Sequence, residues 1–473
     1  MTDPILILLV GILIVVGGII GLRLHPFLAL LLGAFVVAYL TPEVAIEQYA
    51  LTTGASAEGA QQLANQSIGG RIAQQFGSTA GKIGILIAMA SIIGKCMLES
   101  GAAERIVRST LNVTGVKQAP VTFLGSSFFL GIPVFFDTVF YLMIPLAKAM
   151  ATRIGKNYLL LVLCITAGAA MANSLVPPTP GPLFLVSEMN IPIGMMMIGG
   201  FLVGLTTIVA GYAYAVWANR RWPVPLRDSV DAPLEDIKAL GEKEDKFLPP
   251  LWLSLLPILL PIVLITAKAI LDLNESGSGS WLTDGVIFLG EKNLALVLGG
   301  LAALLLLVMQ KQGDRKAMLA AVQAALMTAG VIILITSAGG AFGGMLQQTG
   351  ISARIGELTQ DFQMALLPLA FFIAAVVRTA QGSATVSMIT ASGILAGMAE
   401  VAVLPYHHLY IGLAIACGSK LIPWMNDSGF WIVCKMSNLT EKEALKTFSP
   451  LLTVMGITGL IVILIAAKLF PLV

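Results

Sequence analysis

The chain has 473 residues, of which 57% are hydrophobic and only 11% charged, and its formal net charge is +2. Soluble globular proteins carry about 25% charged residues because their surfaces must be solvated, so this composition excludes a soluble protein of this length. The small net charge gives no support for a nucleic-acid partner. We therefore expect an all-α membrane protein that crosses a lipid bilayer many times.

Few residues are suited to metal or cofactor chemistry. The chain has three histidines, and its four cysteines lie in or beside apolar runs without a CxxC pair. We interpret the cysteines as packing residues, and we predict no metal site, no cofactor and no catalytic residue. The apolar run from Ile5 to Ile20 follows no basic segment and no clear cleavage site, so it is predicted to be a retained first span.

Ten apolar segments are candidates for full crossings, each of which takes about 20 residues in a helix. In chain order they are 4–22, 25–41, 82–98, 157–186, 192–217, 250–271, 292–309, 318–345, 405–434 and 449–471. Segments 157–186 and 405–434 are interrupted and too long for straight helices, so they are predicted to be broken spans. Segments 118–147 and 364–402 are apolar but broken near their middle, and each is predicted to form a re-entrant hairpin.

The distribution of Lys and Arg predicts the orientation, because cytoplasmic loops are enriched in these residues. With the polar segment 218–249 placed in the cytoplasm, the loops on that side hold nineteen Lys and Arg residues. The opposite side holds three, which are Arg71, Lys292 and Arg354. We therefore expect both termini on the outer side of the membrane and a flexible cytoplasmic linker at 218–249.

Short patterns recur at a nearly constant distance along the chain. The run Met97–Gly101 resembles the run Met345–Gly350, with an offset of 249 between the two glycines. Residues 1–217 and 250–473 are therefore predicted to be two repeats, each with five crossings and one hairpin, and chance similarity between apolar segments is the alternative. An odd number of crossings places the second repeat upside down relative to the first, as is typical of secondary transporters.

The interruptions of the first repeat contain polar residues. Asp137 follows the hairpin turn, where a charge in an apolar run costs about 2.5–3.5 kcal/mol; it is a candidate for proton coupling, or it is a structural residue at the hairpin tip. Asn173, Ser174 and Thr179 flank a run of prolines that cannot lie inside a helix. A helix that restarts near Leu183 would direct its positive end at this break. We predict a substrate site here, with a purely structural kink as the alternative.

The second hairpin turn holds Arg378, which needs an anionic partner or water because a guanidinium stays charged. Its planar fork suits a carboxylate, and an internal salt bridge to Asp137 or Asp427 is the alternative. Neutral partners for substrate hydroxyls follow in the sequence, namely Gln381, Ser383 and Thr385. These residues are therefore predicted to bind the substrate.

The second broken span supplies the remaining candidates. Asn426 and Ser428 are predicted to bind the substrate, and Lys420 is predicted to be a charge partner. Asp427 is the second candidate for proton coupling, beside Asp137. Alternatively, Lys420 and Asp427 only neutralise one another.

Four motifs resemble the gluconate permease family, in the same order and over nearly the whole chain. They are Pro133–Asp137, Val176–Pro182, Arg378–Val386 and Asn426–Trp431. The resemblance implies a transporter of a bacterial inner membrane that couples uptake of a small anionic hydroxy-carboxylate, such as gluconate or a related sugar acid, to protons. It also implies a likeness to two-hairpin transporters that work as elevator dimers, so a homodimer is expected.

Other functions remain open at this point. The alternative substrates are D-serine and the short hydroxy acids glycerate and 3-hydroxybutyrate, and sodium is the alternative coupling ion. An ion channel and a membrane-embedded enzyme are the alternatives from other classes. The sequence contains no zincin His pair, Gly-x-Ser-x-Gly elbow or Walker loop, so the protein is not expected to be an enzyme.

Overall fold

The computed structural model consists of helices and contains no strand among the residues that it describes. These residues are 3–115, 118–227, 248–273, 281–312, 314–351, 363–401, 404–425 and 427–472. The expected all-α class is therefore confirmed. The predicted linker 218–249 lies largely outside the described residues.

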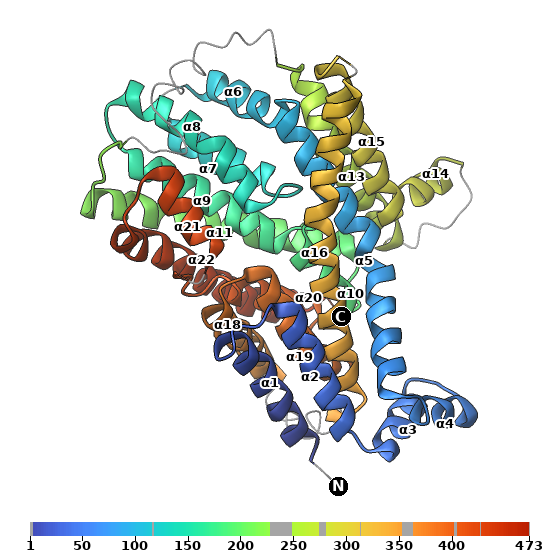
Figure 1. The fold of residues 1–473 in the computed structure, drawn as a ribbon. Helices are drawn as coiled ribbons and strands as arrows, with labels where there is room; N and C mark the ends of the chain where they lie inside the picture. The colour runs from blue at the N-terminus through green and yellow to red at the C-terminus, as the bar shows by residue number, and fades with distance from the viewer. Residues whose placement is uncertain are drawn as a thin grey trace.

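The helices of the two halves follow one another in a similar order (Figure 1). The first half contains α1 (Pro4–Ile20), α2 (Pro26–Leu40), α3 (Glu43–Thr52), α4 (Ala57–Ala64), α5 (Ile68–Glu99), α6 (Ala102–Thr114), α7 (Ala119–Leu130), α8 (Phe136–Ile154), α9 (Tyr158–Leu175), α10 (Pro180–Glu188) and α11 (Ile193–Arg221). The second half contains α13 (Leu251–Leu273), α14 (Trp281–Leu289), α15 (Lys292–Gln310), α16 (Arg315–Gln347), η3 (Gln363–Ala365), α18 (Leu366–Gln381), α19 (Ala384–Val401), α20 (Leu409–Gly418), α21 (Ser428–Ser437) and α22 (Glu441–Leu469).

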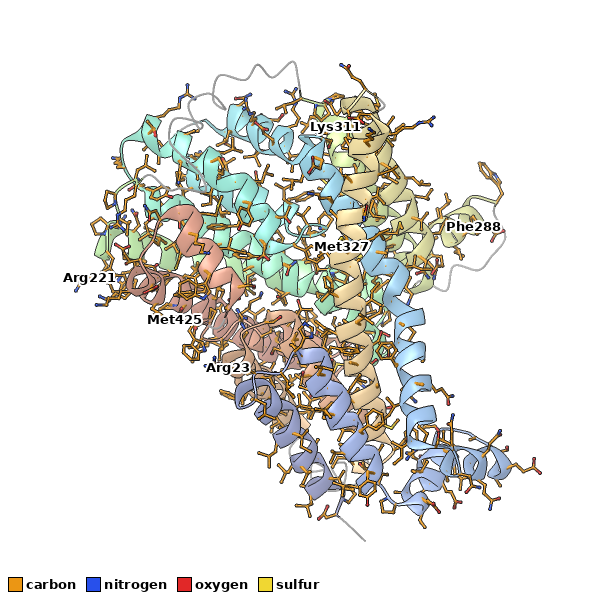
Figure 2. All side chains as sticks on the ribbon, in the orientation of Figure 1. Arg23, Arg221, Phe288, Lys311, Met327 and Met425 are labelled. Carbon is orange, nitrogen blue, oxygen red and sulfur yellow. The ribbon has the colours of Figure 1, made fainter. Side chains whose placement is uncertain are left out.

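The lengths and hydropathies of the helices fit a protein that spans a membrane. Among the described residues, seven helices are long and apolar enough to cross, with α9 and α10 counted together, or up to eight if α2 and α3 form one bent span. Shorter apolar helices include α1, α7, α18, α19 and α20. Large apolar side chains also lie on outer helix faces, such as Phe288 and Met327, which are each 68% exposed (Figure 2). Each of the ten predicted crossings contains a helix, but the number of complete crossings and their orientation stay predictions.

One predicted span begins in the wrong place. The segment was expected to start at residue 82, whereas α5 starts at Ile68 and Ser67 caps it by accepting a hydrogen bond from the N–H of Gly70 at 3.1 Å. The extra turns are polar and rich in glycine, so hydropathy did not reveal them. Arg71, which was counted among the loop residues, is therefore buried in a helix and 4% exposed.

The four predicted interruptions coincide with helix ends. The turn between α7 and α8 and the turn between α18 and α19 each separate two helices, and Gly382 in the second turn has a φ of +87°, which favours glycine. A short gap separates α9 from α10, and a longer one separates α20 from α21. The helix after the first break restarts at Pro180 and not near Leu183, because proline is tolerated in the first turn of a helix.

The helix order and the contacts support the predicted inverted repeat. The helices α16, α18, α19, α21 and α22 begin 247 or 248 residues after α5, α7, α8, α10 and α11. The equivalent helices α5 and α16 run antiparallel, since Gly340 faces Thr79 and, one turn further along α16, Gly344 faces Gln75. The halves also exchange contacts, because α10 packs on α19 and α21 packs on α8. Equivalent helices that run in opposite directions are what an inverted repeat requires.

Helix α16 packs closely on two neighbours through glycines. One face, with Gly340 and Gly344, meets α5, and the other, with Gly339 and Gly343, meets α19. A Cβ atom at Gly343 would lie 2.9 Å from the Cα atom of Gly393 in α19. The backbones of α16 and α19 can therefore approach only because neither residue has a side chain.

We expect Gly343→Ala to lower the apparent melting temperature of the purified protein, because the added methyl group meets backbone atoms that cannot rotate away. Overpacking of this kind costs about 1–3 kcal/mol. Gly330→Ala in the same helix is the control, since no atom lies within 4 Å of a Cβ there. Equal melting temperatures for the two variants would show that α16 and α19 are not in close contact.

Candidate functional site

A buried ion pair joins the turn of the second helix pair to the second break. The Nη2 atom of Arg378 lies 2.5 Å from the Oδ2 atom of Asp427, and the two side chains are 4% and 10% exposed. Arg378 lies in the last turn of α18, and Asp427 is the N-cap of α21, where its Oδ1 atom accepts a hydrogen bond from the N–H of Gly429 at 2.9 Å. One carboxylate therefore caps a helix and neutralises a guanidinium, which is the internal salt bridge considered as an alternative for Arg378.

The rest of the Arg378 guanidinium has no hydrogen-bond partner in the part of the chain that the structure describes. Its Nε and Nη1 atoms are buried and have no hydrogen-bond acceptor among the described residues. A buried polar group without a partner costs about 1–3 kcal/mol, and more when it is charged. These N–H groups are therefore available to the oxygen atoms of an anion.

A second buried cation, Lys420, lies in the same break. It is 4% exposed and lies within electrostatic range of Arg378 and Asp427. Asp427 is paired with Arg378, and within the described part of the chain Lys420 forms no ion pair. The alternative in which Lys420 and Asp427 form a closed pair is therefore not what the structure shows.

Asp137 comes from the first helix pair and reaches the second break. It lies in the first turn of α8, is partly buried, and is within electrostatic range of Asp427. The preceding residue, Phe136, lies beside Gly429, where a Cβ atom would be 3.1 Å from the Phe136 ring. Arg378, Lys420 and Asp427 thus lie together, and Asp137 of the other half lies within electrostatic range of Asp427. We call these four residues the charged cluster.

The first break is closed by a side chain that was predicted to bind substrate. The Thr179 hydroxyl lies 2.7 Å from the Asn173 carbonyl oxygen and 3.1 Å from that of Val176, so it donates its hydrogen within the break. The Nδ2 atom of Asn173 and the Oγ atom of Ser174 are buried without a partner among the described residues. Asn173 and Ser174 therefore retain free polar groups, whereas Thr179 has a structural role and its contact with substrate stays a prediction.

The remaining predicted residues are less informative. Ser383 accepts a hydrogen bond from the N–H of Val386 at 3.3 Å in the first turn of α19. Thr385 is partly exposed and Ser428 is exposed at the start of α21, and no contact described here joins either to the charged cluster. Asn426 and the side chain of Gln381 lie outside the described residues.

Sequence reasoning missed the residues that hold the second break in place. The indole N–H of Trp424 donates to the carbonyl oxygen of Thr379, at 2.8 Å, one residue after Arg378. The hydroxyl of Ser449 donates to the carbonyl oxygen of Pro423, and the Thr453 hydroxyl accepts from the N–H of Ile422 at 3.1 Å. Backbone groups at membrane depth need such partners because no water is available. The tryptophan in the Pro-Trp-Met sequence could have indicated this contact, because a buried indole N–H needs a hydrogen-bond acceptor.

The chain matches a family model described as GntP family permease over residues 3–469. It is 29% identical over 467 residues to the gluconate permease of Pseudomonas aeruginosa, with 97% of each chain covered. It is 30% identical to the gluconate permease of Zymomonas mobilis, with 82% of this chain and 85% of the relative covered. Its fold is similar to that of the YdaH transporter of Alcanivorax borkumensis, whose crystal structure is described as revealing an unusual topology; the TM-score is 0.62 at 16% identity, over 95% of this chain and 100% of the other.

We expect Asp427→Asn to lower the apparent melting temperature clearly. The variant keeps an oxygen atom to cap α21 but loses the charge that neutralises Arg378, and removal of one partner from a buried ion pair costs about 3–5 kcal/mol. The control is Glu99→Gln, because Glu99 pairs with Lys95 where the two side chains are 36% and 32% exposed. That exposed pair should contribute at most about 1 kcal/mol to stability. An equal fall in melting temperature in the two variants would contradict the buried ion pair.

Proposed function

The chain belongs to the GntP family of permeases, and from this premise we propose that it takes up a small hydroxy-carboxylate, such as gluconate, across the inner membrane of a bacterium. Family membership confirms the expected resemblance and the expected class, a multi-pass membrane transporter and not an enzyme. Relatives named gluconate permeases over most of the chain support gluconate as the substrate. The homodimer stays a prediction.

The observation that carries this proposal is the part of the buried Arg378 guanidinium for which the described residues offer no hydrogen-bond acceptor. The free Nε and Nη1 donors lie on different edges of the planar guanidinium, so each can donate to a separate oxygen atom of an anion. Lys420 adds a second positive charge at the same break. We propose that the substrate carboxylate binds here and that Asn173 and Ser174 bind hydroxyl groups of the same molecule.

The balance of charge in the cluster supports coupling to a cation. With Arg378 and Lys420 positively charged and Asp137 and Asp427 ionised, the four charges sum to zero; Asp137 lies within electrostatic range of Asp427. A bound monovalent anion leaves one excess negative charge in a site where charge is costly, and one proton restores neutrality. Asp427 forms an ion pair with Arg378, whereas Asp137 forms no ion pair among the described residues. We therefore propose that Asp137 takes the proton, with sodium as the alternative source of positive charge.

Arg378→Lys should weaken gluconate binding by about 1.5–3 kcal/mol, the usual contribution of a hydrogen bond to a charged group. The substitution keeps the charge but loses the planar donors. Affinity is measured by thermal shift against gluconate, glycerate, 3-hydroxybutyrate and D-serine, and transport by counterflow of labelled substrate in proteoliposomes. The control is Arg71→Lys, which changes a buried arginine whose hydrogen bonds go to the Gln348 side chain and the Ala38 carbonyl oxygen. Unchanged affinity in Arg378→Lys would place the carboxylate on Lys420 or on helix ends instead.

Asp137→Asn should abolish accumulation of substrate against its gradient while counterflow continues. The reason is that the neutral amide cannot exchange a proton but leaves the Arg378–Asp427 pair intact. Accumulation is driven by an imposed pH gradient in sodium-free proteoliposomes, with the unsubstituted protein as the control. If Asp137→Asn still accumulates substrate under these conditions, Asp137 is not the coupling residue. If the unsubstituted protein accumulates substrate only with a sodium gradient, coupling to protons is ruled out.

A further inference from the structure

An apolar groove opens between α11 and α13, away from the charged cluster. Its volume is about 290 Å³. The wall is formed by ten residues, of which Thr266 alone has a polar side chain: Phe129, Ile132, Val176, Met197, Ile198, Phe201, Leu202, Leu259, Ile262 and Thr266. We call this feature the α11–α13 groove.

The rim of the α11–α13 groove belongs to the surface that faces the bilayer. Ile198 and Leu202 on α11 are 38% and 58% exposed, and Leu259 on α13 is 36% exposed. Both helices are long and apolar enough to cross the membrane. The floor is different, because Ile132 and Val176 are each only 2% exposed. A lipid that merely touches the outer surface therefore reaches the rim but not the floor.

The groove cannot hold water or the hydroxylated substrate. An ordered water needs two to four polar partners, and apolar cavities of about 150 Å³ stay dry and take up benzene instead. The α11–α13 groove is about twice that size and opens toward hydrocarbon. The occupant that fits both the wall and the surroundings is a hydrocarbon chain.

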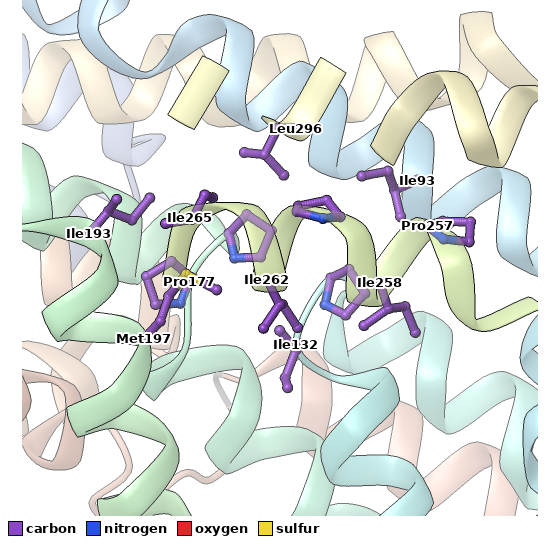
Figure 3. A pocket seen from close by; sticks show the side chains of 13 residues that line it. Ile93, Ile132, Pro177, Ile193, Met197, Pro257, Ile258, Ile262, Ile265 and Leu296 are labelled. Carbon is purple, nitrogen blue, oxygen red and sulfur yellow. The ribbon is translucent and has the colours of Figure 1, made fainter. Parts of the chain in front are cut away.

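The inner end of the groove meets the irregular segments of the first half. Ile132 lies in the turn between α7 and α8, and Val176 immediately precedes the first break. Beyond Ile132, Met197 and Ile262 the groove continues as a narrow seam of about 10 Å³ (Figure 3). The seam separates α13 and its neighbours from the α7–α8 turn and the first break, and five prolines line it: Pro133, Pro177, Pro178, Pro257 and Pro261.

We propose that the α11–α13 groove is a binding site for one acyl chain of a membrane lipid, which enters between α11 and α13 and ends against Ile132 and Val176. The bound chain fills space that is otherwise empty and closes the seam to water. It also places a lipid in direct contact with the first break. The site is separate from the substrate site, so this proposal does not depend on the identity of the substrate.

The experiment uses the full-length protein in liposomes that contain a phosphatidylcholine with a diazirine in one acyl chain. After illumination, labelled residues are located by mass spectrometry. We expect labels on Ile132, Val176 or Met197, which the outer lipid shell cannot reach. Leu202→Trp, which narrows the mouth of the groove, should reduce labelling of these floor residues at least several-fold, and Ile198→Phe provides a second variant.

Val209→Trp is the matched control. It lies seven residues further along α11, is 68% exposed and does not line the groove, so labelling of the floor should be unchanged. The proposal fails if only exposed residues are labelled in the unsubstituted protein, or if Leu202→Trp leaves floor labelling as it was. Cross-links from floor residues to a second protein chain would also overturn it, because they would show that another copy covers the groove.

Discussion

The buried guanidinium of Arg378 has an anion beside it, and this ion pair connects much of the structure. Asp427 supplies the anion for Arg378 and at the same time caps α21. The ion pair therefore holds the tip of the second helix pair against the second break. Asp137 lies within electrostatic range of the same carboxylate from the other half of the chain, so the ion pair lies where the two halves meet.

The two breaks satisfy their backbone groups in different ways. The first is short and needs only the Thr179 hydroxyl, which bridges to carbonyl oxygens of the preceding turn. The second is longer and relies on other helices. Trp424 in this break donates a hydrogen bond to α18, and Ser449 and Thr453 of α22 form hydrogen bonds with the break. The second break is thus tied to its surroundings on both sides of the buried cations Arg378 and Lys420.

Polar and apolar contacts are segregated between the two sides of the molecule. The charged cluster joins α8, α18, α21 and the second break, whereas the surfaces between α13 and the first break contain only apolar groups and prolines. On α16, glycines on two faces let α5 and α19 approach its backbone.

The sequence by itself determined the helical class, the positions of the four interruptions and the charged residues within them. These follow from hydropathy, from prolines that no helix interior accepts and from the cost of charge among apolar residues. Only the tertiary structure decided that Arg378 pairs with Asp427 and that, among the described residues, Lys420 and Asp137 form no ion pair. Such pairing depends on distances between segments that are far apart in the sequence, up to 290 residues for Asp137 and Asp427. Tertiary packing also decided where α5 begins and that Thr179 closes the first break. Polar, glycine-rich turns become helical there because α16 covers them, and a hydroxyl donates to whichever carbonyl oxygen the folded chain leaves open.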